Sequence, residues 1–146
     1  YEVIHHTQFI ADLLAQGRIQ VEVDLQRVVF HDPCYLGRHN GEFDAPRNVL
    51  ARLSSDTPLE MPLSREKAMC CGAGGGRMWM EETIGQRINV VRVQQALQTT
   101  PKVIATACPY CAVMVGDGLG AVNQGDAVAS RDIAELVAEA LVPATP

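Results

Sequence analysis

The 146-residue chain is most constrained by its five cysteines, which form a single pattern with none left over. Cys34 stands alone, Cys70 and Cys71 are adjacent, and Cys108 and Cys111 form a CxxC pair, which gives C-x35-CC-x36-CxxC. An odd number of cysteines grouped in motifs is typical of metal chemistry in a reducing compartment and not of a disulfide framework. The pattern therefore predicts a metal centre built from three distant segments.

The two cysteine pairs differ in what they can bind. A CxxC pair places both sulfurs on one side of a tight turn, so Cys108 and Cys111 can face one metal centre. Successive side chains of an extended chain point to opposite sides, so Cys70 and Cys71 favour two different metals of one cluster. Five thiolates also exceed the four that a tetrahedral zinc or an ordinary iron–sulfur cube takes. Together the pairs indicate an irregular polynuclear cluster.

A glycine-rich stretch follows the adjacent cysteines and fits a bulky cofactor. Gly72, Gly74, Gly75 and Gly76 allow positive φ angles and a close approach of the backbone, whose N–H groups tune a cluster. We expect Gly72, Gly74, Gly75 and Arg77 to contribute to cofactor binding, with Arg77 offsetting the negative charge of the thiolates. The alternative interpretation is a mobile loop with buried thiols.

Composition and charge narrow the class of protein. The chain is 47% hydrophobic and 20% charged, as a single globular domain should be. Its net charge of −5 and lack of a basic run argue against nucleic acid and anionic membrane surfaces as partners. Its apolar runs are far shorter than the ~20 residues that span a bilayer.

Hydrophobic periodicity predicts alternating strands and helices. The expected strands are 27–32, 59–63, 102–107 and 126–130, with a further short strand or edge hairpin at 19–23. The expected helices are 6–16, a short one after residue 44, 78–98, 112–119, and a last one that begins at a capping box in 132–135. This order predicts an α/β, Rossmann-like open sheet, mainly parallel, of about four strands with helices on both faces. Residues 1–26 form an N-terminal helix and connecting segment, and 27–142 the cysteine-rich domain.

The expected fold brings the cysteines together. Cys34 and the CxxC pair each follow a strand, so all three cysteine segments emerge from one edge of the sheet. The long helix 78–98 begins beside the glycines and points the positive end of its dipole at the cluster. At the start of this helix, Met78 and Trp79 are placed to shield the cluster from water.

Three segments of the sequence resemble the cysteine-rich CCG domain family: HDPCYLG around Cys34, CCGAGGG from Cys70, and ACPYC around Cys108. The resemblance covers about residues 28–141. This family occurs in heterodisulfide reductase, in iron–sulfur subunits of glycolate and lactate oxidation systems, and in membrane-associated iron–sulfur oxidoreductases. The segments RHNGEFDAPR and CCGAGGGRMWMEE look most like the last group.

The resemblance implies a cofactor and a setting. It implies a noncubane [4Fe-4S] cluster held by Cys34, Cys70, Cys71, Cys108 and Cys111, although some CCG domains bind zinc instead. It further implies a C-terminal fragment of a larger protein, with an upstream CCG copy and ferredoxin-like domains, as the Pro-containing end 142–146 also suggests. Such a protein passes electrons from a flavoprotein to a quinone and is cytoplasmic, at the cytoplasmic face of the membrane.

The sequence is compatible with three functions. The first is electron transfer through the cluster, and a variant of it is heterodisulfide-reductase-like disulfide cleavage at the cluster. The second is a structural zinc module that shapes an interface. The third is dithiol exchange at Cys108 and Cys111, which leaves the adjacent pair without a role. Whether the chain is itself an enzyme is also open.

Overall fold

Three parallel strands form a small sheet at the centre of the structure, a computed structural model that describes residues 1–142. The strands lie in sequence order, β1 next to β2 and β2 next to β3. Their bounds are β1 (Val28–Phe30), β2 (Val103–Thr106) and β3 (Ala129–Asp132). The α/β class with a parallel sheet is therefore confirmed, while residues 143–146 of the Pro-containing end lie outside the described part.

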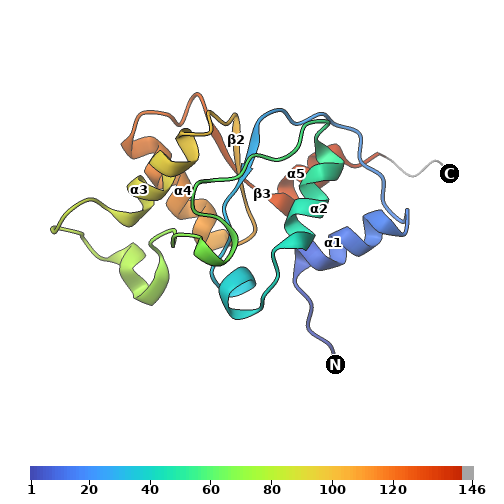
Figure 1. Ribbon diagram of the computed structural model, residues 1–146, viewed down its shortest axis with the longest axis horizontal. Coiled ribbons are helices and arrows are strands. Elements are labelled where there is room, and N and C mark those ends of the chain that lie inside the picture. The colour runs from blue at the N-terminus through green and yellow to red at the C-terminus, as the bar shows by residue number, and fades with distance from the viewer. Residues whose placement is uncertain (143–146) are drawn as a thin grey trace.

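Helices cover both faces of this sheet, as the sequence predicts. Figure 1 shows α3 and α4 on one side of the strands and α1, α2 and α5 on the other. The helices are α1 (His6–Ala15), α2 (Asp44–Leu53), α3 (Ile88–Leu97), α4 (Pro109–Ala121) and α5 (Ile133–Ala140). Among residues 1–142, none of these helices is long and apolar enough to cross a bilayer.

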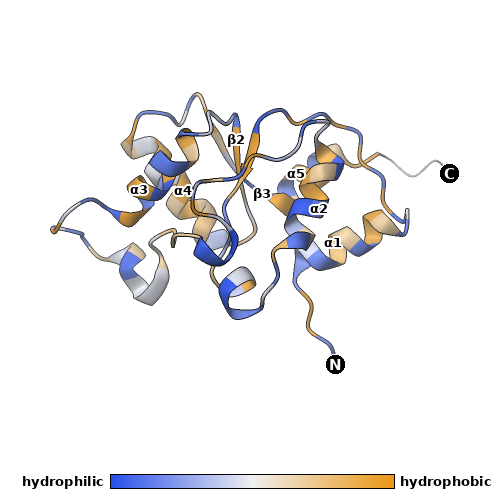
Figure 2. Ribbon diagram, viewed as in Figure 1, coloured by the Kyte–Doolittle hydropathy of each residue, from blue (hydrophilic) through white to orange (hydrophobic). Residues whose placement is uncertain are grey.

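Alternation along the strands divides the apolar core in two. Val28 and Phe30 face the core under α1, α2 and α5, whereas Val29 between them faces the core under α3 and α4. The neighbouring strand does the same with Ala105 and Ile104, because successive side chains of a strand point to opposite faces. Hydrophobic colouring accordingly runs through the centre of the molecule, where β1 and β2 lie (Figure 2).

Two segments expected as strands form only single bridges in the structure. Residue Leu59 makes one parallel bridge to Val29, and Val21 makes one antiparallel bridge to Leu141. Pro62 removes a backbone donor from the first segment, and Leu63 turns outward to solvent. The sheet therefore has three strands in the described residues, one fewer than expected.

The prediction of a long helix over 78–98 is wrong for its first half. A short 3-10 turn covers Gly74–Trp79, and the α-helix begins only at Ile88. Gly85 adopts a φ of +71° between the two, a conformation that leaves the helix, and Ile84 is 92% exposed. Periodicity continues through this segment, but nothing packs against its apolar side, so the pattern alone does not make a helix.

Candidate metal centre

The fold gathers the three cysteine segments at the carboxyl ends of β1 and β2. Cys34 follows β1, and Cys108 is the N-cap residue of α4, immediately after β2. Because these two strands are paired in parallel, both cysteines emerge from the same edge. Cys70 and Cys71 reach this edge from the loop between α2 and α3. The predicted convergence of the segments is thus what the structure shows.

The sulfurs themselves lie close together. The Cys111 and Cys71 Sγ atoms are 3.4 Å apart, and both side chains are buried around Met114. Cys70 and Cys108 pack against this cluster, and Cys34 lines one cavity together with Cys108 and Cys111. All five cysteines lie among the described residues, and none of them forms a disulfide. This donor set fits a thiolate-bound metal cluster.

The thiols alter one another's acidity. A hydrogen bond from the Cys111 thiol, aided by the imidazole of His31, lowers the pKa of Cys71 to about 4 despite burial. A hydrogen bond from Cys111 also lowers the pKa of Cys108 to about 6. The pKa of Cys111 is raised because its proton is held between the other two sulfurs. Burial, with the neighbouring thiols, raises the pKa of Cys34. Two sulfurs at this site are thus already favoured as thiolates, the form that binds metal.

Backbone amides point at sulfur in two places around the cysteines. The N–H of Gly72 donates to Cys70 Sγ over 3.3 Å, and backbone amides of Cys111 and Tyr110 favour the Cys108 thiolate. Gly72 has a φ of +95°, and a Cβ there would stand 3.2 Å from the backbone nitrogen of Asn89. Hence the first turn of α3 lies against Gly72, and not against the later glycines as expected.

The other predicted site residues have fewer contacts with the cysteines. Gly74 and Gly75 have open space where a Cβ would stand. At position 75 only the φ of +65° favours glycine. Arg77 forms an ion pair with Glu82 and is half-exposed. Met78 packs against the cysteine cluster, but Trp79 is 81% exposed. Shielding by Trp79 is therefore wrong for this structure, because the helix that would have turned it inward does not form.

Sequence reasoning missed a buried pair behind the cysteines. His31 and Arg92 are each 1% exposed, and Arg92 Nε donates to His31 Nδ1 over 3.0 Å. One ring nitrogen of His31 lies within 4.8 Å of the sulfurs of Cys71 and Cys111. His31 stands in the HDPC segment three residues before Cys34, which is the signal that could have drawn attention to it. Arg92 carries no such signal, since charged residues in a helix usually face solvent.

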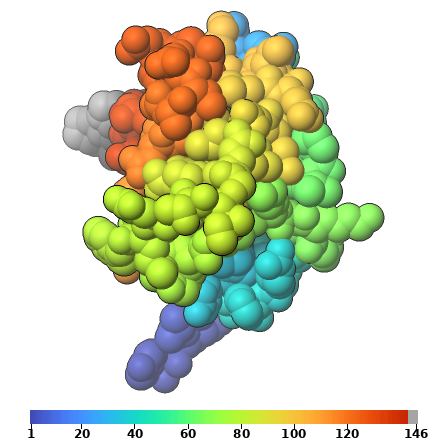
Figure 3. Space-filling view, turned by 90° about the vertical axis from the view of Figure 1, so that its left-hand side faces the viewer, coloured from blue at the N-terminus to red at the C-terminus, as the bar shows by residue number. Residues whose placement is uncertain are grey.

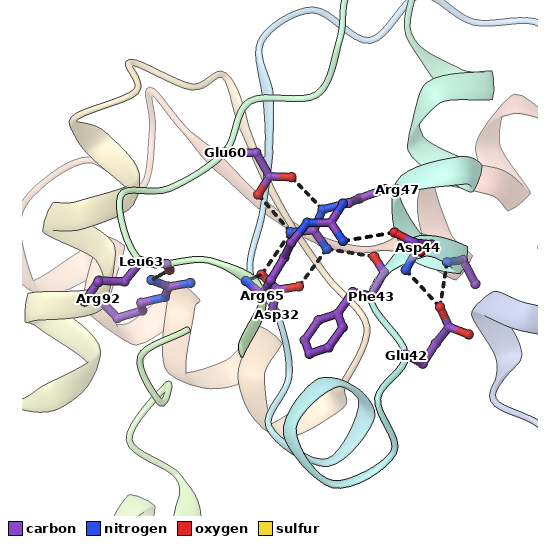
Figure 4. A network of polar contacts seen from close by, with 10 residues as sticks. Asp32, Glu42, Phe43, Asp44, Arg47, Glu60, Leu63, Arg65 and Arg92 are labelled. Atoms are coloured by element: carbon purple, nitrogen blue, oxygen red, sulfur yellow. Dashed lines mark hydrogen bonds and ion pairs between the residues drawn. The ribbon is translucent and has the colours of Figure 1, made fainter. Parts of the chain in front are cut away.

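An ion-pair network that was also missed fixes the loops on either side of the site. Arg47 forks onto the buried Asp32 with bonds of 2.7 and 3.0 Å and also reaches Glu60 (Figure 4). Asp32 further accepts the backbone N–H of Arg65 over 2.8 Å. The segment between α2 and the adjacent cysteines is thereby tied to the end of β1. Asp32 and Arg47 belong to HDPCYLG and RHNGEFDAPR, two of the segments that resemble the CCG family.

A cavity opens onto the site from the side of α1. Its volume is about 530 Å³, and Cys34, Cys108 and Cys111 line it together with the N-terminal residues Val3–His6. The segment after the glycines lies elsewhere. In Figure 3 this yellow-green stretch spreads over the surface between the cyan turn of Tyr35–His39 and the orange part of the chain.

A three-layered α/β domain that gathers five cysteines at one edge of its sheet has the donor set of a thiolate-bound metal protein. A sequence model of the cysteine-rich CCG domain matches residues 28–116, so the chain belongs to the CCG cysteine-rich domain family. The resemblance noted from the motifs is thereby confirmed.

The curated relatives that match the chain are longer oxidoreductases. The chain is 47% identical over 144 residues to the probable iron–sulfur-binding oxidoreductase FadF of Bacillus subtilis, covering 98% of the chain and 20% of that protein. It is 40% identical to the EtfAB:quinone oxidoreductase of Syntrophomonas wolfei, covering 97% of the chain and 21% of that protein. It is 42% identical to one polypeptide of the dihydromethanophenazine:CoB–CoM heterodisulfide reductase of Methanosarcina barkeri, covering 97% of the chain and 34% of that polypeptide.

Two conclusions follow from these similarities. The chain spans between a fifth and a third of the length of these three relatives. The names of the relatives and the gathered cysteines together support an iron–sulfur cluster as the cofactor.

Proposed function

We propose that the chain is a redox module that binds a noncubane [4Fe-4S] cluster through Cys34, Cys70, Cys71, Cys108 and Cys111. The observation that carries the proposal is the gathering of Cys70 and Cys108 around the 3.4 Å contact of Cys71 and Cys111, with Cys34 lining the adjoining cavity. A zinc site or a cube needs only four of them. When bound, such a cluster accepts and passes on single electrons.

The chain's own residues prepare this site. Cys71 and Cys108 are favoured as thiolates, so only part of the ligand set must lose protons when metal binds. The amide of Gly72 and the N-terminus of α4 present N–H groups to sulfur, which stabilise negative charge there. In this proposal Gly72, Gly74, Gly75 and Arg77 surround the cofactor, with Gly72 giving the closest backbone approach.

The proposed setting is a longer iron–sulfur oxidoreductase that passes electrons from a flavoprotein to a quinone at the cytoplasmic face of the membrane. Names of relatives support the setting: one is an EtfAB:quinone oxidoreductase, and another, from Chromohalobacter salexigens, is a probable membrane-anchored ferredoxin. In the proposed division of that protein, residues 1–26 connect to upstream domains and 27–142 form the cluster domain.

The surface around the site supports docking of upstream domains of that longer protein. Large apolar side chains are exposed on each of the three cysteine segments, namely Tyr35, Trp79, Met80, Ile84, Tyr110 and Val113. One cluster alone needs an external electron donor and acceptor, because the chain has no second set of cysteines. We therefore propose that this edge faces the upstream CCG copy and ferredoxin-like domains.

Metal analysis with visible and paramagnetic spectroscopy of anaerobically prepared protein tests the proposal. About four irons per chain, a brown colour and loss of the noncubane signal in Cys70→Ser are expected if each adjacent cysteine holds a different iron. A colourless protein with one zinc would overturn the cluster and leave the structural zinc module. For the docking surface, the chain alone should not reduce a quinone analogue, and the upstream part should restore reduction. Full quinone reduction by the chain alone would overturn docking while leaving the cluster intact.

A further inference from the structure

The buried pair of His31 and Arg92 has no part in the proposed ligand set, yet it lies against it. Arg92 reaches the site from α3, and His31 from the end of β1. A buried guanidinium is costly unless its donors are satisfied and negative groups lie near. The carboxylate of Asp32 and the thiolate of Cys71 are negative groups that act on it. A pair so expensive to bury, directly behind the sulfurs, calls for a role there.

The orientation of the guanidinium is fixed on several sides. Besides the 3.0 Å bond to His31, Arg92 Nη1 donates to the carbonyl of Leu63 over 2.8 Å and to Gln95 over 2.9 Å. Figure 4 shows the contact with Leu63, in the segment that leads to the adjacent cysteines. Gln95 lies one turn further along the same helix. The Nε–H of Arg92 is therefore held in place toward the imidazole.

This bond determines where the imidazole carries its proton. An arginine side chain has only donors and stays protonated in proteins. Its Nε–H can bond to Nδ1 of His31 only if Nδ1 offers a lone pair. The neutral ring then carries its single proton on Nε2, and a second proton on Nδ1 would face the Arg92 donor.

The position of this proton also decides whether His31 is a metal ligand or a hydrogen-bond donor, two roles that distance alone leaves open. A ring nitrogen within 4.8 Å of the sulfurs of Cys71 and Cys111 has the spacing of a metal ligand. A nitrogen must offer a lone pair to bind a metal. In His31 the Nδ1 lone pair is taken by Arg92, and Nε2 carries a proton. What the ring can offer the sulfurs is a hydrogen bond.

We propose that Arg92 holds His31 in the Nε2–H tautomer so that the imidazole donates a hydrogen bond to the sulfur of Cys71, as a positioning residue and not as a metal ligand. A hydrogen bond to a cluster thiolate draws negative charge from it and raises the reduction potential. The inference rests on the proposed function, since it takes Cys71 as a cluster ligand. It adds that Arg92, acting through His31, tunes the negative charge on the Cys71 sulfur.

Electron–nuclear double resonance of the iron-loaded chain with ¹⁵N-labelled histidine distinguishes the roles. The proposal expects a weak ¹⁵N coupling and an exchangeable proton coupling, both lost in His31→Leu. A strong ¹⁵N coupling, as a directly bound imidazole gives, would overturn it. Iron content is measured on the same samples. If the chain holds zinc instead, the proposed cluster fails separately, and ¹⁵N nuclear magnetic resonance reads the tautomer of His31 directly.

Reduction potentials of variants provide a second readout. His31→Leu should shift the potential to a more negative value, and His31→Gln, which keeps an N–H donor, should shift it less. Arg92→Gln should move it in the same direction as His31→Leu, and the double variant should add little. His39→Gln, in the exposed turn after Cys34, is the matched control and should cause no shift. Equal potentials in His31→Leu and the control, with full iron content, would contradict the proposal.

Discussion

The core beneath α1, α2 and α5 and the segment Cys70–Arg87 differ in what holds them in place. In the first, side chains from β1 and three helices interlock, and Val49, Leu50 and Leu53 are fully buried. In the second, helical structure is limited to one 3-10 turn, and Ile84 and its neighbours face solvent. The polar contacts of its exposed part centre on Glu82, which accepts from Arg77 and from the N–H of Ile88.

This contrast separates a framework from a site. Burial of apolar surface fixes the framework without help from a cofactor. The segment after the adjacent cysteines has few buried contacts, so its local stability is low. In our proposal the cluster and the upstream domains supply the stabilising contacts that this segment lacks. Changes to the two regions should therefore have different consequences, and four predictions test this, from the largest effect to the smallest.

Loss of a cysteine should abolish the site and spare the framework. Cys71→Ser replaces a proposed thiolate ligand with a weaker oxygen donor, so we expect the proposed noncubane cluster to be lost or converted. Far-ultraviolet circular dichroism should stay unchanged, because the apolar core does not depend on metal. The same spectrum is expected after removal of the cluster by air and a chelator. An unfolded spectrum in either case would mean that the metal holds the fold, as in a structural zinc domain.

Truncation in the core should do the reverse. Leu50→Ala deletes a side chain that is fully buried in the core of α1, α2 and α5. Such a cavity lowers the free energy of unfolding by about 2–5 kcal/mol, which urea denaturation can measure. Iron content per folded chain should stay at the wild-type value. Loss of iron in a variant that is still folded would show that the two regions are not independent.

A pair of glycines in α4 tests the close packing of α3 and α4 on the other side of the sheet. At Gly118 a Cβ would stand 2.7 Å from Val93 Cγ2 and 3.0 Å from the carbonyl oxygen of Asn89, whereas Gly120 has open space. Gly118→Ala should lower the free energy of unfolding by about 1–3 kcal/mol through overpacking. Gly120→Ala should raise it by about 0.5–1 kcal/mol because alanine favours a helix. Equal thermal denaturation of the two variants would contradict the close approach of α3 and α4.

The smallest effect concerns the cap of α5. Asp132 accepts the N–H of Ala134 over 2.9 Å. Burial opposes its ionisation, but the imidazole of His6, whose Nε2 lies 3.4 Å from Oδ1, and the N–H of Ala134 prevail and hold its pKa below the ordinary 3.8. Asp132→Ala should cost about 1 kcal/mol at neutral pH.

The pH dependence of that cost gives a second check. A carboxyl whose pKa is lowered by folding stabilises the folded state at pH values above its ordinary pKa. This contribution to stability is lost as the pH falls through the pKa of the folded state. The difference between wild type and Asp132→Ala in urea denaturation should therefore shrink as the pH falls below the ordinary 3.8. A difference that grows in acid would contradict the stated direction of the pKa shift.

The sequence predicted the parts of this molecule that follow from local pattern. The apolar strands that begin at Val28 and Val103, the capping box at Asp132 and the convergence of the cysteine segments appear in the structure. It failed for the helix before Ile88, because periodicity does not reveal whether a partner surface exists for the apolar side. Likewise, it missed Arg92, since only the tertiary structure places that helix position against His31.

The convergence of three distant segments has a consequence for biogenesis. During synthesis, Cys34 and β1 leave the ribosome long before β2 and the CxxC pair that must lie beside them. Until β2 pairs with β1, a nascent chain offers isolated thiols that scavenging ions or oxidants can capture. Delivery of iron and sulfide is therefore best timed after Cys111 has emerged and the parallel sheet has closed. In our proposal, insertion of the cluster is then a late step that follows closure of the sheet.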